Sequence, residues 1–346
     1  MNASSDVRCK TVFTIFESSP ENEARVLECI TSLDSDKKIS ACQWTLQIID
    51  FERKISNPDK FFWVTESIGG KIVSVTPIAA KSHLGIFYKI YLATNYYGFY
   101  VDVMLPINFS EFIDFLNKRF RWCLAISLAP LHPDRMRTIT ASNKVDLSSS
   151  TVISKNYFVR IDNFEEYWRS RPSKLKNTVL RKSKKLNSLN AVYRITDHPT
   201  DTDIEDYWEV YNKSWKKNEP NRDFITWVLN NYSERHSVYL GFVYIDNSPV
   251  ASQIWLKENN EYYIFKLAQI CEFDNFSPGT LLTHYLLKSF STNKEIVVNF
   301  LFGLESYKEM WMDLVTDVYD TTVYKNNFTK KIVDLKKKYM TKGVTS

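Results

Sequence analysis

The chain has 346 residues, of which 44% are hydrophobic and 25% charged, and its formal net charge is +5. This composition is typical of a globular protein of about two domains, and it excludes disordered and collagen-like chains. A charge of +5 is small for a dedicated nucleic-acid-binding protein, so nucleic acid is not the expected partner. The eight glycines form neither G-x-G-x-x-G nor a Walker A sequence, which excludes both nucleotide-binding motifs.

The cysteines and histidines argue against disulfide and metal chemistry. The five cysteines include no C-x-x-C pair, and the five histidines never occur at H-E-x-x-H spacing. We therefore expect a reducing compartment and no metal site. The N-terminus lacks the apolar core of a signal peptide, and no apolar run approaches the roughly 20 residues that span a bilayer. These features predict a cytoplasmic protein with no membrane span.

A change of composition predicts two domains. Residues 138–154 are rich in Ser and Thr and show no helical period, which places a boundary between domains 1–145 and 146–346. The alternative is a surface β-hairpin, because residues 152–153 and 157–161 could form strands.

Apolar periodicity predicts the elements in chain order. In the first half, residues 61–66 and 71–78 flank Gly69-Gly70 and predict a hairpin, which residues 238–256 repeat about half a chain later. The second half predicts helices over 172–189 and 204–215, a hairpin over 238–245 and 250–256, a strand over 262–268, a helix over 280–290, a strand over 296–301, a helix over 305–314, a strand over 318–324 and a basic last helix.

Several short motifs in order along the chain resemble one family. They are L-A-T-N-Y-Y (92–97), W-R-S-R-P-S-K-L-K-N-T-V-L-R-K (168–182), F-K-L-A (265–268), F-S-P-G-T-L-L (276–282) and N-F-L-F-G-L-E-S-Y-K (299–308) followed by Trp311. Together they resemble the CelD/BioF-like branch of the GNAT acyltransferase superfamily, over roughly residues 40–320. The family usually has an acidic residue where this chain has Asn299.

The resemblance implies both a fold and an activity. The fold would be α/β, with tandem GNAT-like units that each contain a mixed central sheet flanked by helices, the first unit being degenerate. The activity would be transfer of an acyl group from acetyl-CoA or another acyl-CoA to an amine of a small molecule, sugar or peptide. Direct attack on the thioester is expected, because no Cys or Ser stands in a recognisable nucleophile setting.

The resemblance also implies a cofactor site at the turn before the helix over 280–290. Backbone N–H groups at a helix N-terminus bind anions, and a glycine there leaves room for a pyrophosphate. The alternative is an ordinary helix start. We assign Arg181 and Lys308 to the cofactor as well, although the basic helix that contains Arg181 could simply present a solvated face. The turn residues are Ser277, Pro278, Gly279 and Thr280.

Three residues are candidates for catalysis. Tyr307 would protonate the departing CoA thiolate, Glu219 is the nearest candidate base, and Lys266 would hold a phosphate or an acceptor carboxylate. Tyr307 could instead belong to the core, and Lys266 could point outward from an alternating strand. The candidates for acceptor binding are Trp215, Gln253, Glu305 and Trp311, of which Trp215 could equally be a core residue.

Two rival functions remain at this stage. A Fem-type peptidyltransferase would use the same doubled fold with aminoacyl-tRNA as the donor. A non-catalytic module would use the basic helix to bind nucleic acid or a membrane surface. The sequence does not indicate the oligomeric state.

Overall fold

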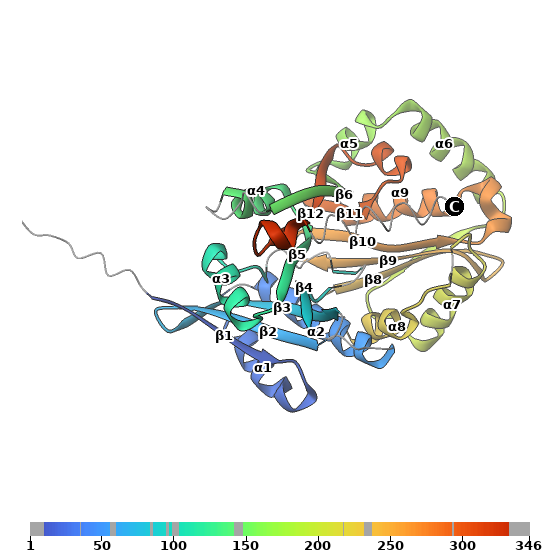
Figure 1. Cartoon of the computed structure of the whole chain (residues 1–346). Coiled ribbons are helices and arrows are strands. Elements are labelled where there is room, and N and C mark those ends of the chain that lie inside the picture. The colour runs from blue at the N-terminus through green and yellow to red at the C-terminus, as the bar shows by residue number, and fades with distance from the viewer. Residues whose placement is uncertain are drawn as a thin grey trace, which may run out of the picture. The chain divides into compact units, whose positions relative to one another are not determined.

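The computed structural model describes residues 10–34, 36–55, 60–83, 86–94, 97–98, 104–141, 148–216, 218–231, 237–292 and 294–331. The chain divides into two compact units (Figure 1). The first unit comprises Met1–Ser154 and Asp317–Ser346, and the second comprises Lys155–Thr316. Each unit contains a β-sheet and helices.

The sheet of the first unit has the strand order β1-β2-β3-β4-β5-β12, in which β4 and β5 are parallel and the other neighbouring pairs antiparallel. Its strands are β1 (Thr11–Glu17), β2 (Lys60–Ile68), β3 (Lys71–His83), β4 (Phe87–Leu92), β5 (Cys123–Leu131) and β12 (Leu314–Tyr324). Its helices are η1 (Pro20–Asn22), α1 (Glu23–Thr31), α2 (Asp36–Ile55), α3 (Phe109–Arg119) and α4 (Pro133–Ala141).

The predicted hairpin of the first half is confirmed as β2 and β3. Gly69 and Gly70 form its turn with φ angles of 59° and 82°, a left-handed conformation that favours glycine. Residues 95 and 96 of the L-A-T-N-Y-Y motif, and most of the predicted last helix, lie outside the described residues.

The sheet of the second unit has the order β6-β11-β10-β9-β8-β7. Its strands are β6 (Ser148–Ile161), β7 (Val192–Thr196), β8 (Ser237–Ile245), β9 (Ser248–Glu258), β10 (Glu261–Gln269) and β11 (Ile296–Gly303). Its helices are α5 (Phe164–Ser170), α6 (Ser173–Asn187), α7 (Asp201–Asn212), α8 (Arg222–Asn231), η5 (Cys271–Phe276), α9 (Pro278–Phe290) and η6 (Ser306–Met310). The predicted fold class, α/β with mixed sheets flanked by helices, is confirmed.

Local sequence explains several element boundaries in the second unit. Thr200 and Asp203 form a reciprocal capping box at the start of α7. Asp246 and Asn247 adopt φ angles of 49° and 60° in the β8–β9 turn, where a tight hairpin requires left-handed residues. Elements α5, β7 and α8 were not predicted.

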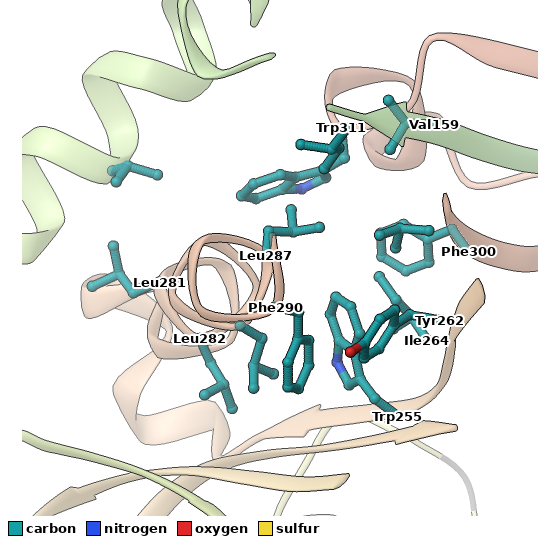
Figure 2. Packing of buried hydrophobic residues seen from close by; sticks show 14 of the residues in the cluster. Val159, Trp255, Tyr262, Ile264, Leu281, Leu282, Leu287, Phe290, Phe300 and Trp311 are labelled. Carbon is teal, nitrogen blue, oxygen red and sulfur yellow. The ribbon is translucent and has the colours of Figure 1, made fainter. Parts of the chain in front are cut away.

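The core of the second unit lies between α9 and the sheet (Figure 2). The ring of Phe290 lies 4.7 Å from that of Tyr262 and 5.4 Å from that of Trp255, measured between centroids. Leu287 of α9 and Trp311 belong to the same buried cluster. Helices α7 and α8 lie on the other face of this sheet (Figure 1).

The two parallel strands of this sheet diverge. β10 and β11 pair only at Glu261–Val297, Tyr262–Val298 and Tyr263–Asn299. Beyond Tyr263 and Asn299 no pairing between the two strands is formed. We call the diverging parts, residues 264–269 and 300–303, the strand fork.

A β-bulge in β10 changes the face of the sheet to which Lys266 points. Ile264 lies opposite Trp255 and Lys266 lies opposite Ile254, so Phe265 is an extra residue in β10. Trp255 and Ile264 face α9 as part of the core. Since neighbouring residues of a strand point to opposite faces, Ile254 and therefore Lys266 face the α7 side. Without the bulge, Lys266 would enter the α9 core.

The helix predicted over 305–314 is wrong. The segment forms the 3-10 helix η6 and then continues into β12 at Leu314. The cause is local, because Lys308 turns inward and donates a hydrogen bond to the carbonyl of Phe302 at 2.8 Å. Consequently Lys308 is buried while Tyr307 is 38% exposed, the reverse of what a helix with Tyr307 facing inward would give.

Candidate active site

A buried ion pair lies beside the strand fork. The Lys266 ammonium is 2.6 Å from Oε2 of Glu219, and the two side chains are only 8% and 4% exposed. The other carboxylate oxygen of Glu219 accepts the backbone N–H of Asn221 at 3.2 Å, and the Tyr211 hydroxyl donates to Oε2 at 3.5 Å. Burial lowers the pKa of Lys266, and the nearby Glu219 carboxylate opposes this shift. The proposal that Lys266 points outward is therefore wrong.

A second ion pair follows β11. The Lys308 ammonium is 3.2 Å from Oε2 of Glu305. Burial lowers the pKa of Lys308, which Glu305 partly offsets. Gly303 makes this arrangement possible, because a Cβ there would overlap both the Glu305 carboxylate and the Lys308 ammonium.

Lys216 is a third lysine close to these two ion pairs. Its side chain is half-buried, and its ammonium lies 6.0 Å from the ring centroid of Tyr211 and 5.9 Å from that of Trp215. Burial lowers the pKa of Lys216 to about 8, and the positive charges of Lys266 and Lys308 add to this effect. Glu219 and Glu305 act in the opposite direction. We call Lys216, Glu219, Lys266, Glu305 and Lys308 the ionic cluster.

A second irregularity shapes the β11 side of the fork. Leu301 adopts a left-handed φ of 56°, and the register between β11 and β6 shifts between Asn299 and Phe302. The side-chain oxygen of Asn299 accepts the N–H of Leu301 at 2.9 Å and so stabilises this conformation. Asn299, the departure from the family pattern, has a structural role here.

The turn predicted to bind the cofactor begins α9, and one of its backbone N–H groups already forms a hydrogen bond to a side chain. Ser277 has a φ of 51° and forms no side-chain cap. The N–H of Gly279 donates to Oε1 of Gln269 at 2.9 Å, and a Cβ on Gly279 would come within 2.8 Å of that oxygen. Pro278 is buried and Thr280 is half-buried. The glycine therefore admits the Gln269 side chain to the start of the helix.

The other predicted residues are dispersed. Gln253 is buried and donates to the carbonyl of Gly279 at 2.9 Å and to Thr283 at 2.8 Å, so it anchors the start of α9. Trp311 is 3% exposed and lies in the core, whereas Trp215 is 56% exposed. Arg181 is exposed on α6. The structure therefore brings Glu219, Lys266, Glu305 and Lys308 together. Gln253 instead contacts the start of α9, and Trp311 is buried in the core.

Lys216 and Gln269 were not among the site residues predicted from the sequence. Lys216 follows a tryptophan at the end of a helix, a place where an exposed lysine is ordinary, and only the fold shows it beside Tyr211 and the ionic cluster. A Gln side chain that caps a helix ten residues later in the chain leaves no local sequence signal.

Arg171 of the R-P-S motif anchors the segment after η6. Its side chain is 4% exposed, donates to the carbonyl of Trp311 at 3.0 Å and forms an ion pair with Asp313. Its guanidinium also lies 4.5 Å from the ring centroid of Tyr167. The motif residue therefore fixes the chain that leaves the fork.

The described residues contain no group of three or more His, Cys, Asp or Glu side chains placed to hold a metal ion. Within the same residues, no helix has the length and apolarity to cross a membrane.

Comparison with known proteins finds one matching family model. Residues 173–309 match the sequence model of the acetyltransferase (GNAT) domain family. No curated protein matches the sequence.

Solved structures share the fold. FemX superposes with a TM-score of 0.56 at 7% identity, over 89% of this chain and 96% of that one. L-PGS from Bacillus licheniformis gives a TM-score of 0.54 at 11% identity, over 91% and 94%. The C-terminal domain of a putative lysylphosphatidylglycerol synthetase from Agrobacterium fabrum gives 0.53 at 11% identity, over 90% and 95%. At such identities the similarity shows the fold alone.

The contacts at Gly303 predict a loss of stability on adding one methyl group. Gly303→Ala should lower the free energy of unfolding by about 1–3 kcal/mol, because the new Cβ overlaps the Glu305–Lys308 pair. Denaturant unfolding measures the change. The control is Leu304→Ala, since Leu304 is 71% exposed and its truncation should change stability by less than about 0.5 kcal/mol. Equal effects of the two variants would contradict the packing described here.

The lowered pKa of Lys216 predicts a pH-dependent stability difference. Between pH 8 and about pH 10.5 the unfolded chain retains the proton that the folded chain loses, so the Lys216 contribution to stability rises with pH. Lys216→Met should therefore be more stable than the wild type at pH 7, and the difference should shrink by pH 9.5. Denaturant unfolding at both pH values tests this.

The control for this measurement is Lys213→Met. Lys213 is exposed and its pKa is raised by the hydrogen bond to Glu209, so its removal should not stabilise the protein at pH 7. A stability difference between Lys216→Met and the wild type that stays the same, or moves further in favour of the variant, between pH 7 and pH 9.5 would contradict the prediction.

Proposed function

From the match of residues 173–309 to the acetyltransferase (GNAT) domain family, we propose that this protein transfers an acyl group from an acyl-CoA thioester to an amine acceptor. The acceptor class is an amine of a small molecule, sugar or peptide. The observation that carries the proposal is the strand fork with the ionic cluster beside it.

The strand fork is the proposed place for an extended ligand, the pantetheine arm of the donor. Beyond Tyr263, β10 no longer pairs with β11. A ligand held there would bring its thioester to the ionic cluster.

The proposed reaction is direct. The neutral amine attacks the thioester carbonyl, a C–N bond forms and the C–S bond breaks, and the products are an amide and the CoA thiol. The amine loses one proton, and the thiolate gains one. We propose Glu219 as the proton acceptor, with Lys266 holding it in place at 2.6 Å, and Tyr307 as the donor to the thiolate.

The donor phosphates would bind at the start of α9. The helix N-terminus favours anions, and the Lys182 ammonium contacts the carbonyl of Asn275 just before that turn. Since Gln269 occupies the N–H of Gly279, a pyrophosphate at this position would have to replace the Gln269 oxygen.

In a second candidate the donor is an aminoacyl-tRNA. This donor has no pyrophosphate, so it would not need the N–H of Gly279 that Gln269 already occupies. The structural similarity to FemX and to L-PGS is compatible with this candidate, and helix α6 beside the turn carries several lysines. Both candidates place the chemistry in the same fork, so the donor is the point to test.

The donor proposal predicts stabilisation by acyl-CoA. An acyl-CoA at about 100 times its dissociation constant should add about 2.7 kcal/mol to the free energy of unfolding. Gly279→Asp should abolish this effect, because it places bulk and negative charge at the phosphate position. Thermal unfolding with acetyl-CoA and longer acyl-CoAs measures both.

A matched variant separates charge from position. Thr292→Asp adds the same charge near the other end of α9, at an exposed residue, and should retain the response. An undiminished shift in Gly279→Asp would place the phosphates elsewhere. If no acyl-CoA shifts the wild type while charged tRNA supports aminoacyl transfer, the second candidate replaces the first.

The role of Tyr307 predicts a specific kinetic loss. Its ring packs edge-on against Phe300 at 5.6 Å between centroids and is partly exposed, so removing the hydroxyl leaves this contact intact. Tyr307→Phe should retain acyl-CoA binding and stability but lose about 10²-fold in turnover, the usual scale for a general acid. Turnover within a few-fold of the wild type would exclude Tyr307 as the acid.

A further inference from the structure

The ionic cluster carries an unbalanced charge. It contains three ammonium groups, Lys216, Lys266 and Lys308, and two carboxylates, Glu219 and Glu305. Charges removed from water are normally paired, because an unpaired one is costly. The charge balance of the cluster is therefore incomplete by one negative group.

Both carboxylates are committed to other lysines. Glu219 pairs with Lys266 at 2.6 Å and also accepts bonds from Tyr211 and Asn221. Glu305 pairs with Lys308 at 3.2 Å. Each of these lysines therefore already has its partner.

Lys216 is the cation without such a partner. Within the part of the chain that the structure describes, no carboxylate lies within ion-pair distance of its ammonium. Its neighbours are the faces of Tyr211 and Trp215, which attract a cation more weakly than a carboxylate does. The two rings position the ammonium, and an anionic partner would add a stronger interaction than either ring provides.

A second polar group on the same face also lacks a partner. Asn156 lies opposite Phe302 in the β6–β11 pairing and is 3% exposed, and its side-chain oxygen has no hydrogen-bond partner among the described residues. Its neighbour Tyr157 belongs to the α9 core, so Asn156 points to the α7 side, as Lys266 does. This oxygen is available to accept a hydrogen bond from a bound molecule.

We propose that Lys216 binds an anionic group of the acceptor, so that the acceptor is an amine that also carries a carboxylate or a phosphate. This inference rests on the proposed acyltransferase function and narrows its substrate class. An amino acid or a phosphorylated amine fits, because its anion supplies the missing negative charge and its amine N–H groups supply hydrogen-bond donors. The exposed ring of Trp215 beside the ammonium adds an apolar surface for the carbon skeleton between them.

The experiment compares pairs of amines that differ only in the anion. Glycine is paired with glycinamide, and O-phosphoethanolamine with ethanolamine. Binding to the wild-type protein without any acyl-CoA is measured by calorimetry at pH 7. At least one anionic member should bind at least about tenfold more tightly than its neutral partner, the scale of one charge-assisted hydrogen bond.

Variants assign this preference to Lys216. Lys216→Met should weaken binding of the anionic member by about 10- to 100-fold and leave that of the neutral one unchanged. Lys216→Arg keeps the charge and should retain the preference within a few-fold. Lys213→Met removes a nearby exposed charge and should have no effect. Circular dichroism confirms that each variant is folded.

Two results would overturn the proposal. One is equal binding of the anionic and neutral members of both pairs to the wild type. The other is a Lys216→Met protein that loses acetyl-CoA affinity while keeping the anionic amine, which would assign the lysine to a donor phosphate. Acetyl-CoA binding to the wild-type protein is measured separately. If the wild type does not bind acetyl-CoA, the proposed function fails, and this outcome is distinguishable from both results above.

Discussion

The second unit depends on the cost of burying an ammonium group. Lys266 stands in a strand whose other inward side chains are apolar, and regular alternation would carry it into the α9 core. The extra residue at Phe265 rotates it to the opposite face, where Glu219 neutralises it at 2.6 Å. The same bulge lies next to the point where the pairing of β10 with β11 stops, and bulges bend the strand that contains them. One inserted residue therefore both keeps the Lys266 ammonium out of the apolar core and contributes to the divergence of the two strands.

This arrangement explains why the functional side chains come from distant parts of the sequence. Glu219 follows α7, Lys266 lies in β10, and Lys308 follows β11. A fork between two central parallel strands is reached from the helix on one face and from the loop after the second strand.

The predictable part of the fold is the part with a long apolar period. Helix α6, the hairpin of β8 and β9, and strands β10 and β11 follow from spacing alone, because each buries one continuous face. Short elements such as β7 and α5 carry too few residues to show a period. The 3-10 helix η6 was mistaken for a longer helix, because the spacing of Tyr307 and Trp311 fits an α-helix and an inward lysine was not foreseen.

Four of the five residues of the ionic cluster, Glu219, Lys266, Glu305 and Lys308, were candidates from the sequence, and Lys216 was not. Alternation along the strand could not reveal the bulge that sets the direction of Lys266. Gln253 was assigned to substrate, yet its amide holds the first turn of α9. A buried polar residue in a strand looks the same in a sequence whether it binds a ligand or fastens a helix.

The segment that leaves the fork is fastened at both ends by cations that bind backbone carbonyls. Lys308 holds the carbonyl of Phe302, and Arg171 holds that of Trp311. Moving residues 303–311 as a flap would break both bonds, so we expect this wall of the fork to keep its backbone conformation when ligands bind. Selectivity among acceptors should then change by replacing side chains on a fixed backbone, and libraries directed at Leu304, which is exposed on this wall, would redesign specificity without altering the backbone.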